Sequence, residues 1–219
     1  MTLLLLLLFL SFLAGSIPTS IIAGQVTRGI DIRDYGSGNA GGTNALRVLG
    51  WKAGATVVML DAFKGWFAAA VISGWRFGAA LGQLSPADPH LVPVLCGAAA
   101  MAGHSFSLFA GFRGGKGVST LGGMLLYLYP GALFLGVLVW LAVLAATGYV
   151  SLGSVTAVTL FPIAAYLQDG TLSTSLGVVS LVLVGFIWFT HRANLARLLA
   201  GTENRFEKVM IFKPRKTDA

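Results

Sequence analysis

VSTLGGMLLYLYPGALFLGVLVWLAVLAAT, from Val118 to Thr147, is the stretch of this sequence that decides the fold. Its 30 residues carry no charge. As one helix they would be about 45 Å long, whereas the hydrocarbon core of a bilayer is about 30 Å thick. Because proline is tolerated at the start of a helix, the stretch predicts two helices that meet near Tyr129, Pro130 and Gly131. The first, Val118 to Tyr129, is about 18 Å long, so it either crosses the membrane or is tilted into one leaflet without crossing fully.

The rest of the chain is similarly apolar. Of 219 residues, 56% are hydrophobic and 11% are charged, whereas soluble domains carry about 25% charged residues. Further charge-poor segments approach or exceed the roughly 20 residues that cross a bilayer. They are Met1 to Gly24, Ala53 to Gly74, Leu91 to Ala110, Ser154 to Leu167 and Leu172 to Thr190. Together with the two helices above, they predict an all-α membrane protein, a seven-helix transmembrane bundle formed by one domain over residues 1–219.

The first segment resembles a secretory signal in its leucine content. However, no basic residue precedes the run from Leu3 to Leu8, and the apolar stretch is longer than the hydrophobic region of a signal, which is about 7 to 15 residues. We therefore expect it to remain as the first membrane helix. The single cysteine, Cys96, cannot form an internal disulfide and suggests no metal cluster.

The basic residues indicate the orientation of the bundle. Of the 15 Lys and Arg residues, 13 lie in three places: four in Gln25 to Lys52, two in Gly111 to Gly117 and seven in His191 to Ala219. Seven spans place all three on one side of the membrane, whereas six would put the last opposite the first two. Because basic loops stay in the cytoplasm, we expect the N-terminus outside and the C-terminus, with its basic tail (195–219), inside.

Three polar stretches lie on this predicted cytoplasmic side, and the first is GSGNAGGTNALR, from Gly36 to Arg47. Its glycines match the G-x-G-x-x-G spacing, but a membrane helix precedes it instead of a strand, which excludes a dinucleotide-binding unit. Glycine-rich backbone still allows N–H groups to approach an anion closely. Arg47 can clamp a phosphate from a helix that begins near Thr43. The alternative is a polar turn between helices. The further candidate donors are Ser37, Asn39, Thr43 and Asn44.

The second stretch is GHSFSLFAGFRGGKGVST, from Gly103 to Thr120. It fails the P-loop pattern, because Gly117 follows Lys116 where Ser or Thr is required. A glycine-rich turn with a lysine at a helix start is nevertheless typical of a phosphate site. The alternative is a basic anchor loop, and His104 can equally be a core histidine. The predicted binding residues are His104, Gly114, Gly115, Lys116 and Gly117.

The third stretch is HRANLARLLAGTEN, from His191 to Asn204. His191, Asn194 and Arg197 share one helical face at a spacing of three. A histidine at the membrane border can accept a proton or stabilise developing charge, although it can also be an interfacial anchor. We expect Glu203 to be a structural partner of nearby arginines.

One charged pair lies inside a predicted span. Asp61 and Lys64 are three residues apart, and charges in lipid are costly unless they pair within the bundle. We expect a structural ion pair, with a functional role as the alternative.

These stretches, in order and spacing, resemble the bacterial membrane acyl-phosphate:glycerol-3-phosphate acyltransferases, the PlsY family. The resemblance covers essentially the whole chain and rests on GSGNAGGTNALR, Asp61 with Lys64-Gly65, GHSFSLFAGFRGGKGVST and HRANLARLLAGTEN. It implies a multi-pass protein of the bacterial inner membrane. The implied reaction transfers a fatty acyl group from acyl phosphate to the 1-hydroxyl of glycerol 3-phosphate, which gives lysophosphatidate and phosphate, the first acylation of phospholipid synthesis.

The resemblance also implies roles for single residues. Ser37, His191 and Asn194 are the expected catalytic residues around the reacting hydroxyl and carbonyl, while Arg47 and Lys116 hold phosphates. Direct attack by glycerol 3-phosphate is preferred to an acyl-Ser37 intermediate, because no Asp or Glu of these stretches is placed to orient His191 as in a hydrolase triad. Either His191 or a substrate phosphate is then the base.

Acyl phosphate has a good leaving group, so positioning and charge stabilisation suffice, and we expect no metal, nucleotide or other cofactor. The expected partners are the two substrates and membrane lipid, without nucleic acid or an obligatory protein partner. Two other interpretations compete. A transporter of a phosphorylated solute is disfavoured because transporters show internal repeats and midplane binding groups. An acyltransferase that uses acyl-CoA is disfavoured because the chain has no His-x4-Asp motif.

Overall fold

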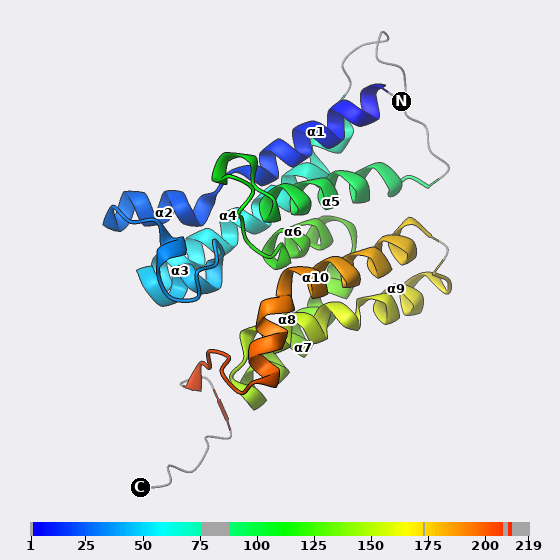
Figure 1. The fold of residues 1–219 in the computed structure, drawn as a ribbon. Coiled ribbons are helices and arrows are strands. Elements are labelled where there is room, and N and C mark those ends of the chain that lie inside the picture. Colours follow the sequence, from blue (N-terminus) through cyan, green and yellow to red (C-terminus); the bar gives the residue numbers. More distant parts are fainter. Residues whose placement is uncertain (1, 76–87, 173, 208–209, 212–219) are drawn as a thin grey trace, which may run out of the picture.

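The structure, a computed structural model, describes residues 2–75, 88–172, 174–207 and 210–211. Every regular element in these ranges is helical, in agreement with the predicted all-α architecture (Figure 1). Residues 208–209 and 212–219 of the predicted basic tail lie outside the described residues.

The helices follow one another with short connections. The first half of the chain forms α1 (Thr2–Ser16), α2 (Thr19–Arg28), α3 (Gly42–Leu49), α4 (Trp51–Ala70) and α5 (Leu91–Ser105), with 3-10 turns η1 (Ile32–Asp34), η2 (Ile72–Gly74) and η4 (Leu108–Ala110). The second half forms α6 (Val118–Leu128), α7 (Pro130–Thr147), α8 (Val150–Thr159), α9 (Phe161–Asp169) and α10 (Ser175–Leu199).

The predicted break in the stretch from Val118 to Thr147 is confirmed. α6 ends at Leu128, and Pro130 is the first residue of α7, where its missing N–H costs no hydrogen bond. α6 has 11 residues, about 16 Å. The chain reverses direction after it, so the start of α1 and the end of α10 lie at opposite ends of the bundle (Figure 1).

Six helical segments in the described part are long and apolar enough to cross a membrane, and α6 is a seventh, shorter apolar helix. The six are Thr2–Arg28, Trp51–Gly74, Leu91–Ala110, Pro130–Thr147, Val150–Leu167 and Gly177–Leu199. Most of them occupy the predicted segments. The first is longer than expected and is divided at Ile17 and Pro18 into α1 and α2, and the last continues nine residues beyond Thr190 to Leu199.

The core lies between the helices, and much of the outer surface is apolar. α5, α6 and α10 share a buried cluster that includes Met101, Met124 and Ile187. α7 buries only Ala132, while its outward residues such as Phe134 are exposed. An apolar outward face of this kind is typical of a helix that contacts lipid.

Glycine allows α4 and α6 to approach closely. A Cβ on Gly65 would lie 1.9 Å from the backbone oxygen of Thr120, and one on Gly123 would lie 1.7 Å from that of Ala62. Close backbone approach at small residues is common between membrane helices. It fixes α6, and therefore the loop that leads into it, against α4.

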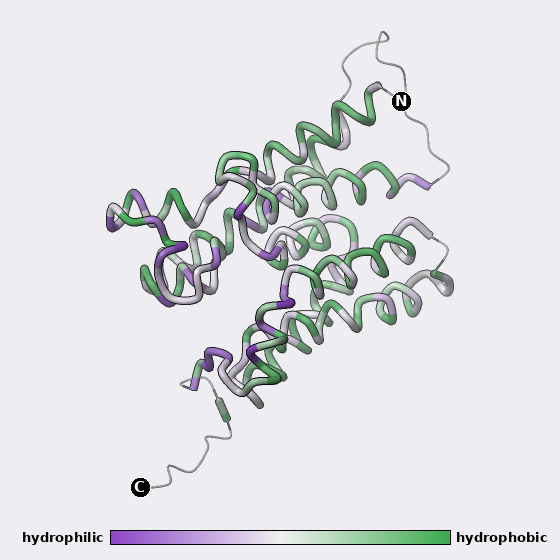
Figure 2. Tube along the Cα trace, viewed as in Figure 1, coloured by the Kyte–Doolittle hydropathy of each residue, from purple (hydrophilic) through white to green (hydrophobic). Residues whose placement is uncertain are grey.

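The expected Asp61–Lys64 ion pair is present, at 2.6 Å, and it supports the break between α1 and α2. Lys64 Nζ donates to the carbonyl of Ile17 at 2.8 Å, and Thr19 Oγ1 donates to Asp61 at 2.5 Å. Hydrophilic residues otherwise gather at the end of the bundle that holds α2, α3 and the end of α10 (Figure 2).

Candidate active site

One large cavity brings the three polar stretches together. It has a volume of about 780 Å³ and lies between α3, α4, α6, α7, α8 and the end of α10. Ten of the twelve predicted site residues line it: Ser37, Asn39, Thr43, Asn44, Arg47, His104, Lys116, Gly117, His191 and Asn194. Predicted site residues up to 157 positions apart in the chain therefore line one cavity.

Asn44 shapes the first stretch into a loop. Its Oδ1 accepts a hydrogen bond from the backbone N–H of Ser37 at 2.8 Å, and its Nδ2 donates to the carbonyls of Ile32 at 3.1 Å and Tyr35 at 3.0 Å. Gly36 and Gly38 have positive φ, a conformation that favours glycine. Both polar atoms of the Asn44 side chain are thus engaged by the loop, and its observed role is to position Ser37.

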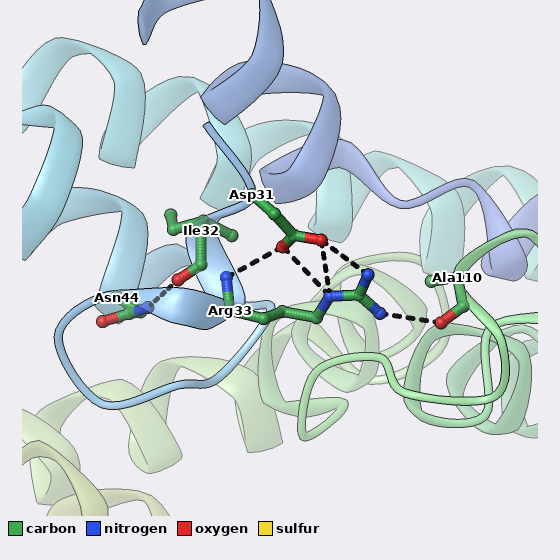
Figure 3. Close-up of polar contacts among 5 residues, drawn as sticks. All are labelled: Asp31, Ile32, Arg33, Asn44 and Ala110. Carbon is green, nitrogen blue, oxygen red and sulfur yellow. Dashed lines mark hydrogen bonds and ion pairs between the residues drawn. The ribbon is translucent and has the colours of Figure 1, made fainter. Parts of the chain in front are cut away.

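Arg33, which the sequence pattern did not single out, lies three residues before the first stretch and connects that segment with the second stretch. Its guanidinium binds the carboxylate of Asp31, with Nη2 at 2.6 Å from Oδ2, and its Nη1 donates to the carbonyl of Ala110 at 2.8 Å (Figure 3). These hydrogen bonds hold the pKa of Asp31 below its ordinary value. The only sequence signal was a pair of opposite charges two residues apart, which is too common to indicate this contact.

Gly114 and Gly115 do not line the cavity, unlike the other predicted residues. Their N–H groups donate to the carbonyls of Ser105 and His104, both at 3.1 Å. A Cβ on Gly115 would lie 2.1 Å from Nε2 of His104. These glycines therefore pack the turn onto the end of α5, and Gly117, with φ of +87°, then starts α6.

His104 lies between this turn and Asp61. Its Nδ1 is 3.4 Å from Oδ1 of Asp61, and both residues line the cavity. Asp61 is thus part of the cavity wall as well as of the structural pair with Lys64. The sequence pattern had favoured the structural role.

His191 is buried at the end of α10 and lines the cavity. Its Nδ1 is 2.9 Å from the carbonyl of Ile187, four residues earlier. Because a carbonyl can only accept, Nδ1 carries the hydrogen in this contact and Nε2 of the neutral ring is left as an acceptor. The group that orients His191 in the structure is thus a backbone carbonyl.

A chain of polar contacts connects Lys116 with the third stretch. Lys116 Nζ donates to Oδ1 of Asn194, whose Nδ2 donates to Glu203 at 2.6 Å. Glu203 also accepts from Ser151 at 2.8 Å and from Arg197 at 2.7 Å. Burial alone would raise the pKa of Glu203, but these hydrogen bonds outweigh it and keep the pKa below its ordinary value. Ser151, on α8, was not predicted.

Two cationic side chains face the cavity without a carboxylate bound directly to either among the described residues. Burial lowers the pKa of Lys116 to about 8, and the charges of Arg197 and Arg47 act in the same direction. Burial also lowers the pKa of Arg47, which lies over the ring of Phe206 at 5.1 Å. Partly desolvated cations of this kind bind phosphate strongly.

The far end of the cavity is apolar. It is lined by residues of α4, α6, α7, α8 and α9, among them Leu125, Val137, Trp140, Val158 and Phe161. The lining of the cavity thus combines cationic and polar side chains near Lys116 with apolar side chains between the helices. The described residues contain no group of three or more His, Cys, Asp or Glu side chains that could hold a metal ion.

Comparisons with known proteins identify the family of this chain. The family model for glycerol-3-phosphate acyltransferase matches residues 5–201. The glycerol-3-phosphate acyltransferase of Chlorobium phaeobacteroides (strain BS1) is 43% identical, covering 92% of this chain and 96% of its own. That of Chlorobaculum tepidum is 42% identical, covering 91% and 94%.

A solved structure has the same fold. The crystal structure of PlsY (YgiH), an integral membrane glycerol 3-phosphate acyltransferase, in its glycerol 3-phosphate form, superposes with a TM-score of 0.78 at 33% identity. The match covers 93% of this chain and 95% of that one, and the lysophosphatidic acid form gives the same values. With the family model, the relatives and the fold in agreement, this chain belongs to the glycerol-3-phosphate acyltransferases, which are integral membrane enzymes.

Proposed function

We propose that this acyltransferase uses acyl phosphate as its donor and forms lysophosphatidate and inorganic phosphate. The observation that carries the proposal is the large cavity, which has Arg47 and Lys116 at one end and an apolar lining at the other. Both substrates carry a phosphate and one carries a fatty chain, so this cavity matches the pair. The solved relative in its glycerol 3-phosphate and lysophosphatidic acid forms supports the choice of acceptor and product.

The proposed reaction is a direct transfer. Arg47 and Lys116 hold the phosphates side by side, and the 1-hydroxyl oxygen of glycerol 3-phosphate attacks the acyl carbon. The carbon–oxygen bond to phosphate breaks, and the hydroxyl proton passes to Nε2 of His191 or to a substrate phosphate oxygen. Asn194, which is held between Lys116 and Glu203, fixes the ammonium group beside the reacting atoms.

Ser37 and Asn39 complete the proposed polar end. Both line the cavity, and the backbone N–H of Ser37 is anchored to Asn44. The remaining residues that we place around the substrates are Thr43, His104 and Gly117. Gly114 and Gly115 do not contact the substrates but pack the turn that holds Lys116 onto the end of α5.

The polar end faces the cytoplasm of a bacterial inner membrane in this proposal, with α6 counted as the fourth of seven passes. The support is that 13 of the 15 Lys and Arg residues fall in three regions of the sequence, which an odd number of passes places on one side of the membrane. Single cysteines introduced beside Ser37, Lys116 and Asn194 should all react with an impermeant reagent from the cytoplasmic side. Periplasmic labelling at any of the three contradicts this orientation.

The donor is tested with purified enzyme and labelled glycerol 3-phosphate. Acyl phosphate should yield labelled lysophosphatidate, and acyl-CoA of the same chain length should not. Product from acyl-CoA alone would overturn the proposal and favour the competing acyl-CoA enzyme. Incubation with acyl phosphate in the absence of glycerol 3-phosphate separates the two routes, because an acyl ester trapped on Ser37 would contradict direct attack.

A further inference from the structure

A second, smaller cavity adjoins the apolar end of the large one. It has a volume of about 140 Å³ and is lined by α7, α8 and α9. Four residues line both cavities: Ala132, Gly136, Ala157 and Phe161. They therefore form a wall between the two spaces, which we call the partition.

The partition is built from three small residues and one large one. Ala132 and Gly136 are four residues apart on one face of α7, and Ala157 and Phe161 have the same spacing on the facing segment of α8 and α9. Phe161 is 5% exposed. Its ring is the only bulky side chain in the partition, so it is the group that most limits the space beyond.

The smaller cavity continues the apolar path of the large one. All of its lining residues are apolar, and three of them, Leu135, Leu160 and Ile163, are exposed on the outer surface of the bundle. A chain that passed the partition would therefore remain among hydrocarbon groups. Nothing polar would have to be desolvated on the way.

The partition is far from the polar end. Ser151, which binds Glu203, and Phe161 are ten residues apart along α8 and α9, about 15 Å for a helical rise. Substitutions at the partition can thus change the apolar end while leaving Lys116 and His191 in place.

We infer that the partition limits the length of the acyl chain that the large cavity can hold. Phe161 contacts the terminal carbons of a bound acyl group, and the smaller cavity is the space that a longer chain would enter. This inference rests on the proposed function, because it takes the large cavity to be the acyl site. It assigns to Phe161 and Gly136 the selection of chain length, which the three polar stretches do not explain.

Gly136→Leu tests the inference because it adds a bulky side chain to the partition and so shortens the space for the acyl chain. A Cβ at Gly136 meets no atom within 4 Å, so a side chain can enter without displacing backbone. We expect kcat/KM for stearoyl phosphate to fall relative to dodecanoyl phosphate, by about fourfold for each methylene group excluded. Gly131→Leu is the matched control, since it lies on the same helix, has the same open surroundings and lines neither cavity.

Phe161→Ala tests the opposite change. Removing the ring joins the two cavities, so the ratio of kcat/KM for stearoyl phosphate to that for dodecanoyl phosphate should rise. Phe186→Ala is the control, because Phe186 packs against the same core but lines neither cavity. If Phe161→Ala does not fold, Gly136→Leu decides alone.

Failure of this inference can be distinguished from failure of the proposed function. A wild-type enzyme that makes no product from any acyl phosphate contradicts the donor, and the chain-length profiles are then measured with acyl-CoA. An active Gly136→Leu variant with the chain-length profile of the wild type overturns the partition as a determinant of length.

Discussion

Lys116 and Asn194, which are 78 positions apart in the chain, are joined by a hydrogen bond from the ammonium group to the amide oxygen. The hydrogen-bond partner of this half-buried lysine is therefore neutral, and the carboxylate of Glu203 lies on the other side of the amide. The positive charge at the polar end is consequently available to a substrate phosphate.

The charge of Lys116 predicts that the activity of the enzyme falls at alkaline pH. Burial lowers the pKa of Lys116 to about 8, so the free enzyme loses this charge as the pH rises through that value. Because phosphate binds the protonated form, kcat/KM for glycerol 3-phosphate should fall above about pH 8. In Lys116→Arg the guanidinium stays charged and the falling limb should move to higher pH. Lys52→Arg, at an exposed lysine, is the control. If the pH profile of kcat/KM falls at the same alkaline pH in the wild type and in Lys116→Arg, Lys116 is not the group responsible.

Arg33 should matter for substrate binding although it lies outside the three polar stretches. Arg33→Ala removes the contacts with Asp31 and Ala110 and lets the two glycine-rich loops separate. A displacement of about 1 Å can cost up to about 100-fold in rate, so we expect kcat/KM for glycerol 3-phosphate to fall by between about 10-fold and 100-fold. Steady-state kinetics check this, with Arg28→Ala, an exposed residue of the same segment, as control. Equal kinetics for the two variants would show that Arg33 does not position the loops.

The close contact of α4 with α6 predicts opposite effects at two neighbouring glycines. Gly123→Ala places a Cβ 1.7 Å from the backbone oxygen of Ala62 and should destabilise the protein by about 1–3 kcal/mol. A Cβ at Gly122 would have Cδ1 of Leu133 as its nearest neighbour, at 3.7 Å, so Gly122→Ala should be neutral or stabilising by up to about 1 kcal/mol. Thermal unfolding in detergent measures both. Equal Tm values would contradict the close approach.

The buried pair of Asp61 and Lys64 predicts non-additive stability. Asp61→Asn leaves the ammonium of Lys64 without its counter-charge and should cost about 3–5 kcal/mol. Adding Lys64→Met removes the uncompensated charge, so the double variant should regain a large part of the lost Tm. A double variant that is less stable than Asp61→Asn alone would mean that Lys64 acts mainly through its hydrogen bond to Ile17.

The membrane architecture was largely predictable because it depends on local composition. The uncharged stretch from Val118 to Thr147 was too long for one helix, and Pro130 marked the break that the structure contains. The division at Pro18 was missed because the apolar run continues across it. Pro18 cannot continue the helix because it has no N–H, and Lys64 from another helix binds the carbonyl of Ile17.

The candidate site was predictable where residue type alone carries the chemistry. Arg47, Lys116 and His191 are reactive or charged groups in glycine-rich or interfacial stretches, and all three line the cavity. Arg33 and Ser151 contact the site through partners 77 and 52 positions away, so no local pattern marked these contacts. Asn44 was predicted to bind substrate because its amide can donate and accept hydrogen bonds. In the structure the amide instead binds the backbone of its own loop.

The shape of the large cavity determines in which phase, membrane or water, the concentration of each substrate is expressed for this enzyme. A donor with a fatty chain can keep its tail in hydrocarbon throughout, and an acceptor with a phosphate can keep its head in water, because the two ends of the cavity match the two solvents. With the proposed acyl phosphate as donor, the enzyme therefore samples the donor in two dimensions and glycerol 3-phosphate in three. Saturation by this donor is set by its mole fraction among the lipids, while saturation by the acceptor follows the aqueous concentration.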